Sequence, residues 1–193
     1  MAAETTSRAT PSQTVGPFFH DALLDRDYSK LVAEDHPEAI ALAGTVYDGA
    51  GDPVPDALVE VWQAHPSGRF AHPEDGREEL PLEEGFYGFG RSGTQDGGFR
   101  FVTLKPGPVP GERPGEEQAP HLAVSVFARG LLKRVVTRVY FPDEPERNAE
   151  DPVLRGIEDD RLRESLIATR ERAGVYRFDV HLQGERQTAF FGF

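Results

Sequence analysis

Prolines and glycines interrupt this chain at short intervals from one end to the other. The sequence has 16 prolines and 20 glycines among its 193 residues, spread along the whole length. Such spacing favours many short strands joined by turns over a few long helices. We therefore predict an all-β chain that forms one domain over residues 1–193, with an N-terminal arm at residues 1–20.

Between these interruptions, apolar and polar residues alternate with a period of two. The alternation predicts an antiparallel pair from residues 41–47 and 57–63, and a tight hairpin closed by Asp96-Gly97-Gly98. Residues 121–128 and 132–141 form the clearest predicted hairpin. The pattern thus indicates an antiparallel β-sandwich.

Other segments are predicted to form a loop, two short helices and a last strand. Residues 105–120 contain five prolines and three glycines and are predicted to be one long loop. Residues 159–171 carry apolar residues on one helical face behind an aspartate cap, and residues 21–34 have room for a second short helix. The apolar residues 187–193 are expected to form a terminal strand.

Charge and composition narrow the function. The formal net charge is -12, which works against binding to nucleic acid or to an anionic membrane surface. An anionic substrate would need a local cation, so arginines near a cleft gain interest. The chain has no cysteine, which removes disulfides and thiolate metal sites, and it shows neither a membrane span nor an export signal. The expected location is cytoplasmic.

Histidine spacing gives little support for a self-contained metal site. No two histidines are spaced as HxH, HxxH or HExxH, and the best candidate is His72-Pro73-Glu74, with the His-x-acid spacing of facial-triad iron sites. A metalloenzyme using His65, His72, Glu74 or His121 stays open as one alternative, and a β-sandwich binding or carrier module without catalysis as another. The histidines are His20, His36, His65, His72, His121 and His181.

Five segments carry a resemblance to a known family. They read TPSQTVGPFF at 10–19, GTVYDGAGDPVPDALVEVWQAHPSGRF at 44–70, FGRSGTQDGGFRFVTLKPGPVP at 89–110, APHLAVSVFARG at 119–130 and TRVYF at 137–141. Together they span most of the chain, and it resembles the intradiol ring-cleavage dioxygenases. The resemblance implies a β-sandwich of mixed sheets with one or two short helices, and a reaction in which O2 cleaves an aromatic diol between its two hydroxyl-bearing carbons.

In the iron-bearing chains of this family, two tyrosines and two histidines hold a ferric ion, but the corresponding positions here differ. They read Phe70, Val109, His121 and Ala123. Three of the four positions cannot coordinate a metal, because their side chains have no donor atom. The resemblance implies that this chain binds no metal and that Fe(III) is held by a homologous iron-binding beta subunit in a hetero-oligomer.

The same resemblance assigns this chain a part in substrate binding, with no catalytic residue of its own. The implied contacts are Thr14, Gly16 and Pro17 in the arm and Arg129 after the segment 121–128. Arg129 would offer a cation to a small aromatic acid, 3,4-dihydroxybenzoate, whose cleavage product is 3-carboxy-cis,cis-muconate. The alternatives at these positions are a rigid extended arm and a solvated hairpin arginine.

Overall fold

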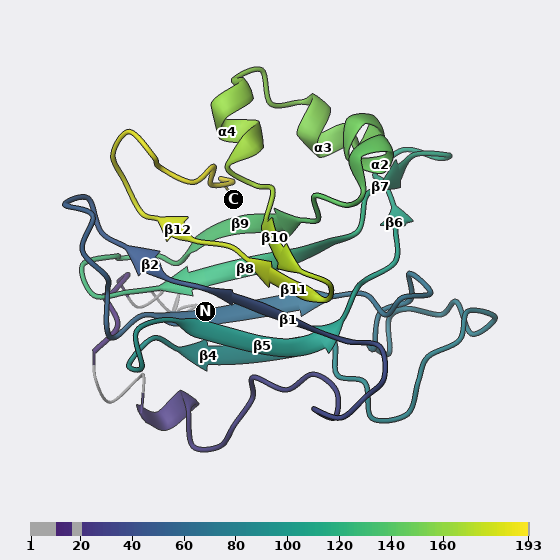
Figure 1. Cartoon of the computed structure of the whole chain (residues 1–193), viewed down its shortest axis with the longest axis horizontal. Coiled ribbons are helices and arrows are strands. Elements are labelled where there is room, and N and C mark those ends of the chain that lie inside the picture. The colour runs from purple at the N-terminus through teal and green to yellow at the C-terminus, as the bar shows by residue number, and fades with distance from the viewer. Residues whose placement is uncertain (1–10, 17–20, 193) are drawn as a thin grey trace, which may run out of the picture.

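The computed structural model describes residues 11–16 and 21–192 and shows two four-stranded sheets packed face to face (Figure 1). One sheet has the order β10-β11-β1-β5 and the other β4-β3-β8-β9. Strand β1 runs parallel to β11 but antiparallel to β5, so the first sheet is mixed. The predicted all-β sandwich of mixed sheets is therefore confirmed.

The strand bounds are as follows. The first sheet contains β10 (Thr169–Arg172), β11 (Val175–Arg177), β1 (Ala39–Gly44) and β5 (Phe99–Leu104). The second contains β4 (Phe89–Gly93), β3 (Leu58–Gln63), β8 (His121–Phe127) and β9 (Val135–Tyr140). Two short pairs join β12 (Val180–His181) to β2 (Val46–Tyr47), and β6 (Val109–Pro110) to β7 (Glu117–Gln118).

The core lies between the two sheets and follows from the alternation. Every second residue of β1 and of β8 is buried, and burial of each such Val, Leu, Ile or Phe contributes roughly 1.5–3 kcal/mol. Gln63 fastens the sheets to each other, since its buried amide nitrogen donates to the Leu104 carbonyl at 2.8 Å. The main cluster includes Leu42, Val59, Val61, Phe99, Phe101, Leu122, Val124 and Phe178.

Two predicted strand pairings are wrong. Strands β1 and β3 lie in opposite sheets, and so do β4 and β5, so residues 94–98 cross between the sheets instead of closing a hairpin. Gly97 has the positive φ, 91°, that the predicted turn required. Thr94 anchors the crossing, because its hydroxyl donates to Val54 O at 2.6 Å and accepts from Ala57 N at 3.0 Å. Alternation identifies which face of a strand is buried, but not which strand lies beside it.

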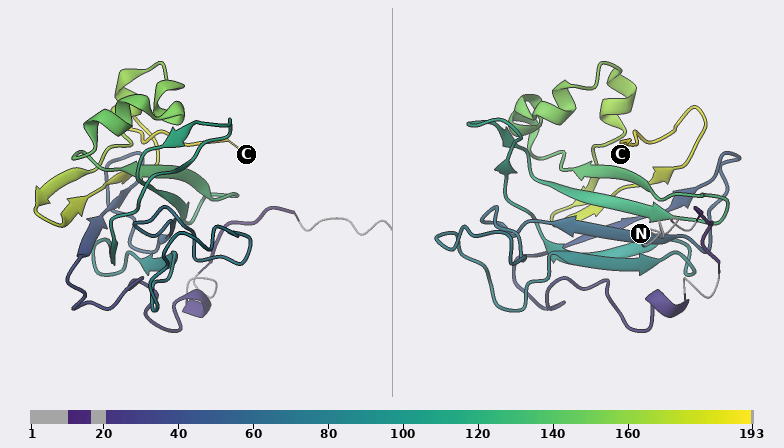
Figure 2. Two further views of the ribbon diagram at one scale, coloured as in Figure 1. Left: turned by 90° about the vertical axis from the view of Figure 1, so that its right-hand side faces the viewer. Right: turned by 180° about the vertical axis from the view of Figure 1, so that it is seen from behind.

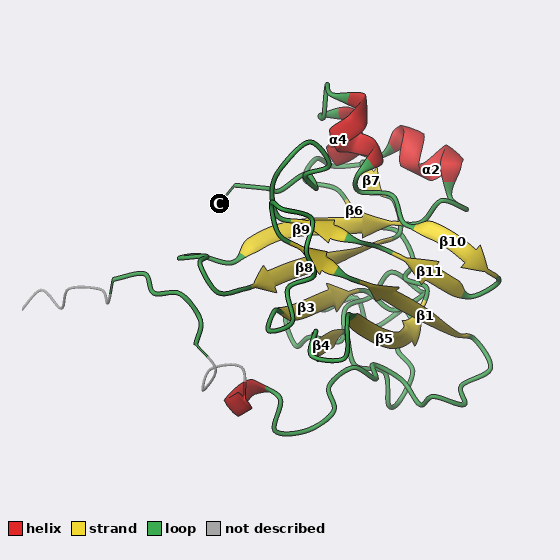
Figure 3. Ribbon diagram, turned by 60° about the vertical axis from the view of Figure 1, so that its left-hand side comes forward, coloured by secondary structure: helices red, strands yellow, loops and turns green. Residues whose placement is uncertain are grey.

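Three short helices lie together beside β7 and β9, and one helical turn lies on the opposite side of the sandwich (Figure 3). The three helices are α2 (Pro145–Glu150), α3 (Pro152–Arg155) and α4 (Asp160–Glu164). The predicted helix at 159–171 is wrong after Glu164. The residues that follow it form backbone hydrogen bonds with Tyr140 at the end of β9, whose amide donates to Leu166 O and whose carbonyl accepts from Ala168 N. In place of the predicted helix at 21–34, a single helical turn covers residues 21–23.

The remaining predictions are confirmed in part. Strands β8 and β9 form the predicted hairpin, in register from His121 opposite Tyr140. The predicted loop at 105–120 contains the small β6–β7 hairpin. The expected C-terminal strand is reduced to one bridge between Phe191 and Val136. Within the described residues, no helix is long and apolar enough to cross a membrane.

Candidate functional site

The four positions that correspond to iron ligands lie on or beside the outer face of the β4-β3-β8-β9 sheet, and His121 and Ala123 share the half-buried side of β8. Trp62 on β3 is the register partner of Ala123 on β8 and projects away from the core. The ring of Phe70 lies nearly parallel to that of Trp62, with centroids 5.9 Å apart at an angle of 3°. Phe70, Trp62 and Val109 line one open cleft of about 470 Å³. The fold therefore keeps the ligand positions together after their donor atoms have been lost.

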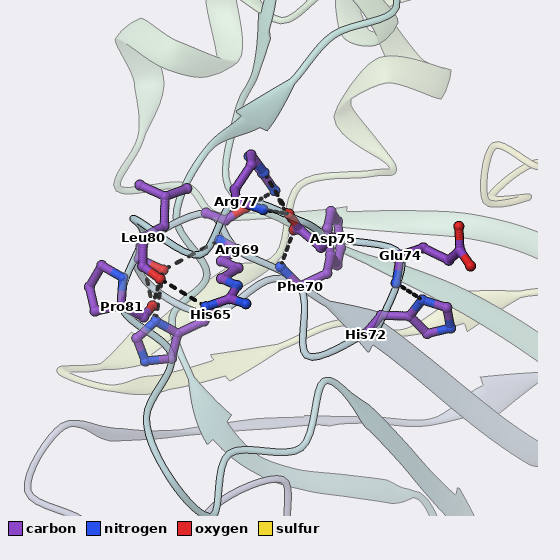
Figure 4. Close-up of polar contacts among 11 residues, drawn as sticks. His65, Arg69, Phe70, His72, Glu74, Asp75, Arg77, Leu80 and Pro81 are labelled. Carbon is purple, nitrogen blue, oxygen red and sulfur yellow. Dashed lines mark hydrogen bonds and ion pairs between the residues drawn. The ribbon is translucent and has the colours of Figure 1, made fainter.

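An aspartate–arginine pair holds the loop that carries Phe70 (Figure 4). Asp75 accepts a hydrogen bond from Phe70 N at 2.7 Å and binds the Arg77 guanidinium through both oxygens, at 2.8 and 2.6 Å. Arg77 also donates to Gly68 O at 2.9 Å, which closes the loop. The hydrogen bonds from Arg77 hold the pKa of Asp75 well below its usual range. Sequence reasoning missed this pair, because the only signal is an Asp-x-Arg spacing in a loop.

His121, the one remaining ligand-type residue, is held as a neutral structural histidine. Its Nδ1 lies 2.8 Å from Ala119 O and donates to it, and its ring packs on Tyr140 with centroids 5.3 Å apart. Burial, together with the nearby positive charge of Arg138, lowers the pKa of His121 to about 4. The imidazole is therefore uncharged at neutral pH.

A buried polar network supports His121 from behind. Asp151 is fully buried and accepts hydrogen bonds from Tyr140 Oη at 3.2 Å and from Ala119 N at 2.8 Å. Arg138 donates to Tyr140 Oη at 3.2 Å and to Gln118 Oε1 at 2.5 Å. Burial raises the pKa of Tyr140 well above its usual value, so the phenol keeps its proton. The network braces the β7–β8 corner and presents no free base.

The residues present do not fit a ferric ion. Phe70, Val109 and Ala123 offer no donor atom, and one neutral imidazole is too few ligands. In the part of the chain that the structure describes, no group of three or more His, Asp or Glu side chains converges on a possible metal position.

The alternative metal set named above is not assembled either. His65 packs on Phe86, whereas His72 lies against Trp62 and accepts a hydrogen bond from Glu74 N. His121 packs on Tyr140. Among the described residues, no three of these side chains converge on a possible metal position.

The predicted substrate-binding residues gather at the other end of β8. Thr14 Oγ1 accepts a hydrogen bond from Gly130 N at 2.8 Å, which pins the arm beside Arg129. Arg129 is two-thirds exposed, and its Nε lies 3.2 Å from Asp56 Oδ1. Gly16 lines, with Thr14, Leu131 and Arg134, a cleft of about 470 Å³ between the arm and the β8–β9 turn. Pro17 lies outside the described residues.

The two halves of this candidate site are too far apart to act together within one chain. Ala123, which lies opposite Trp62 beside the cleft, is the third residue of β8, and Arg129 follows the strand's last residue, Phe127, by two positions. Six residues of extended chain span about 20 Å at roughly 3.3 Å per residue. A molecule bound at Arg129 therefore cannot reach the cleft at Phe70.

Comparisons with known proteins identify the family. A family model described as "Dioxygenase" matches residues 14–184. The protocatechuate 3,4-dioxygenase alpha chain of Pseudomonas putida is 42% identical, with 95% of this chain and 96% of that protein covered. The beta chain of the same enzyme from Burkholderia cepacia is 38% identical, with 92% and 77% covered.

Solved structures agree with this assignment. The dioxygenase domain of a carbohydrate-binding fusion from Streptomyces sp. SirexAA-E is 26% identical, with a TM-score of 0.56 over 83% of this chain and 88% of that one. Catechol 1,2-dioxygenase from Acinetobacter sp. ADP1, at 19% identity, shares the fold with a TM-score of 0.55 over 80% of this chain and 56% of that one. The chain therefore belongs to the intradiol ring-cleavage dioxygenase family, and it is similar in sequence to both the alpha and the beta chains of protocatechuate 3,4-dioxygenase.

Proposed function

We propose that this chain is the subunit without iron of a protocatechuate 3,4-dioxygenase, an enzyme of the cytoplasm. A homologous beta chain holds the Fe(III), and the two chains together cleave 3,4-dihydroxybenzoate with O2 to 3-carboxy-cis,cis-muconate. When bound, the ferric ion supplies the centre at which the catechol oxygens are held for reaction with O2. The present chain completes the binding site around it.

One observation carries the proposal: the ligand positions lacking donor atoms and the predicted substrate residues occupy opposite ends of β8. One bound molecule cannot reach both ends of β8 in a single chain. The end near Arg129, called the substrate end below, can therefore contribute to ring cleavage only if it faces the iron of another chain. The arm fits that arrangement, since residues 11–16 project on the side of the β4-β3-β8-β9 sheet and away from β1, β10 and β11 (Figure 2, left).

Each proposed contact has a chemical role. The Arg129 guanidinium is two-thirds exposed, and although its Nε pairs with Asp56 Oδ1, its two terminal nitrogens can donate to the carboxylate of an aromatic acid. Thr14 holds the arm against Gly130, so the backbone at Gly16 is presented at a fixed position. A Cβ at Gly16 would have no atom of the described residues within 4 Å, which leaves room there for a ligand or a partner. Pro17, outside the described residues, completes the predicted set.

Co-expression with a beta-type chain tests the proposal. The chain produced alone should contain no stoichiometric iron and turn over no substrate. The co-purified complex should carry iron, show the visible absorption of phenolate bound to ferric iron, and consume O2 with 3,4-dihydroxybenzoate. Iron and turnover in the isolated chain would refute the proposal, as would a complex whose iron remains when the ligands of the beta chain are replaced.

A further inference from the structure

Asp56 lies opposite Arg129, just beyond the ends of the β3–β8 pair. In the antiparallel register of these strands, Leu58 is the partner of Phe127. Two further residues along each chain bring Asp56 beside Arg129 on the same face of the sheet. The two side chains form an ion pair, with Arg129 Nε 3.2 Å from Asp56 Oδ1. The strand pairing therefore determines which acid stands next to this arginine.

The backbone on both sides of Asp56 is held by one buried side chain. The hydroxyl of Thr94 donates to Val54 O at 2.6 Å and accepts from Ala57 N at 3.0 Å. Ala57 is itself fully buried, so the segment has little freedom to move. Arg129, by contrast, is a long side chain on a turn, and it is two-thirds exposed. Asp56 is thus the anchored member of the pair.

One oxygen of Asp56 depends on the arginine. Oδ1 is shielded from solvent and accepts no hydrogen bond from any described residue, while the Arg129 guanidinium lies 3.2 Å away. A carboxylate oxygen that is removed from water without a partner is costly, so the opposite charge of Arg129 is drawn to this position. The pairing therefore restricts where the guanidinium can lie.

The contact with Asp56 leaves the rest of the guanidinium free to bind. Nε carries one of its five N–H donors, and the two terminal nitrogens carry the other four, in the fork that matches a carboxylate. An arginine that is already oriented loses less conformational freedom when its ligand arrives. The pair with Asp56 is therefore an arrangement that prepares Arg129 for an anion.

Two neighbouring cations offset the negative charge of Asp56. Lys133 and Arg134 line the cleft between the arm and the β8–β9 turn, and Arg129 lies on the same turn. Three cations face one carboxylate, so an anionic ligand still meets a positive local field. Asp56 can hold Arg129 without making this end of the chain repel the substrate.

From this geometry we propose that Asp56 is a positioning residue for the substrate carboxylate, acting through the orientation of the Arg129 guanidinium. The inference rests on the proposed function, in which Arg129 contacts the carboxylate of 3,4-dihydroxybenzoate. Asp56 itself touches neither the substrate nor the iron. It therefore governs the affinity for carboxylated catechols, and with it the preference for them over uncharged catechols, and it has no part in ring cleavage.

Steady-state kinetics of the complex reconstituted with the beta-type chain test this proposal. Asp56→Ala should raise KM for 3,4-dihydroxybenzoate about 3- to 10-fold and leave kcat within about 2-fold. The inhibition constant of 4-methylcatechol, which has no carboxylate, should not change. Asp56→Asn keeps the shape of the side chain and an oxygen beside Nε, and should raise KM in the same direction by a smaller factor. The matched control is Asp52→Ala, which removes the same charge from an exposed residue of the same loop and should leave KM unchanged.

A double-mutant cycle shows whether Asp56 acts through Arg129. In the Arg129→Ala background, Asp56→Ala should raise KM no further, because the group that it orients is gone. A fall in KM on replacing Asp56 overturns the proposal, since the aspartate would then compete with the substrate for the guanidinium. An equal rise with and without Arg129, or an equal loss of affinity for 4-methylcatechol, overturns it as well.

The outcomes separate this inference from the function on which it rests. Those three results, in a complex that holds iron, turns over and loses affinity on Arg129→Ala, refute the role of Asp56 and leave the proposed function intact. A wild-type complex that loads no iron or cleaves no substrate refutes the proposed function, and the role of Asp56 falls with it.

Discussion

Replacement of Asp151 by asparagine should cost far more stability than the loss of one negative charge suggests. Asp151 is 0% exposed, and its two oxygens accept four hydrogen bonds. Oδ2 accepts from Ala119 N at 2.8 Å, while Oδ1 accepts from Val153 N at 2.8 Å, Leu154 N at 2.9 Å and Tyr140 Oη at 3.2 Å. The carboxylate therefore joins helix α3 to the end of β9 and to the start of β8.

Asparagine has one acceptor oxygen and cannot accept both from Ala119 N and from the two N–H groups of helix α3. If the amide nitrogen takes the place of Oδ2, the N–H of Ala119 faces another donor; in the opposite orientation, both helix N–H groups do. One buried donor left without a partner costs about 1–3 kcal/mol, and the remaining bonds lose the strength that the charge gave them. Removal of a buried charge offsets part of this loss, so we expect Asp151→Asn to lower the free energy of unfolding by about 2–4 kcal/mol.

Urea unfolding, followed by circular dichroism and by the fluorescence of the single tryptophan, Trp62, measures the effect. The matched control is Asp159→Asn, which changes an exposed aspartate that caps α4 through Arg161 N and Leu162 N. Asparagine and aspartate are about equal as N-caps, so the control should change stability by less than about 0.5 kcal/mol. Equal effects at the two positions would refute the reasoning, because Asp151 would then act only as a helix cap.

Three further predictions concern the substrate end, pH and packing. Arg129→Ala in the reconstituted complex should raise KM for 3,4-dihydroxybenzoate roughly 10- to 150-fold, the loss of about 1.5–3 kcal/mol from one charged hydrogen bond; a change in assembly alone, seen by gel filtration, would contradict it. The folded pKa of His121 is about 4 against 6.5 when unfolded, so the unfolded chain takes up the proton first and stability falls as the pH drops from 6.5 to 4. His121→Gln should flatten that slope by up to about 1.4 kcal/mol per pH unit, and an unchanged slope in urea titrations would contradict this assignment. Gly44→Ala should destabilise strongly, since its Cβ would lie 1.8 Å from Phe178 O, whereas Gly76→Ala, with open space around it, should be nearly neutral; melting curves compare the two.

The sequence predicts the fold class and the buried faces because both depend on local alternation. It predicts the β8–β9 hairpin for the same reason, since a short turn joins neighbouring strands. It fails at β1 and β3, which lie in different sheets, because pairing between distant strands is decided by packing across the whole core. It also fails after Glu164, where a helical pattern gives way to hydrogen bonds with Tyr140. Long-range contacts explain both errors.

The candidate site divides in the same way. The resemblance names Phe70, Val109, His121 and Ala123, and the structure places Phe70, Val109 and Ala123 around Trp62. No sequence pattern points to Asp151, which lies 32 residues beyond Ala119 and reaches it only through the fold. Asp75 and Arg77 are close in sequence, but the sequence does not show what the pair does. In the structure Asp75 accepts from Phe70 N and Arg77 donates to Gly68 O, so the pair fixes the loop that carries Phe70.

Charges of opposite sign lie near the two ends of β8, with cations near Arg129 and carboxylates near Phe70. This separation helps to explain how an acidic chain can bind an anionic substrate. Among the described residues, the charged ones that line the cleft at the arm are Lys133 and Arg134, and Arg129, whose Nε pairs with Asp56, lies beside Gly130 of the same turn. The cleft at Phe70 has Glu74 and Asp75 against the single, already paired Arg77. With a net charge of -12, the chain as a whole repels an aromatic acid, so a local cluster of cations has to overcome that field. The cations stand at the end that faces the partner's iron in the proposed complex, and the acidic rim stands where no substrate is needed.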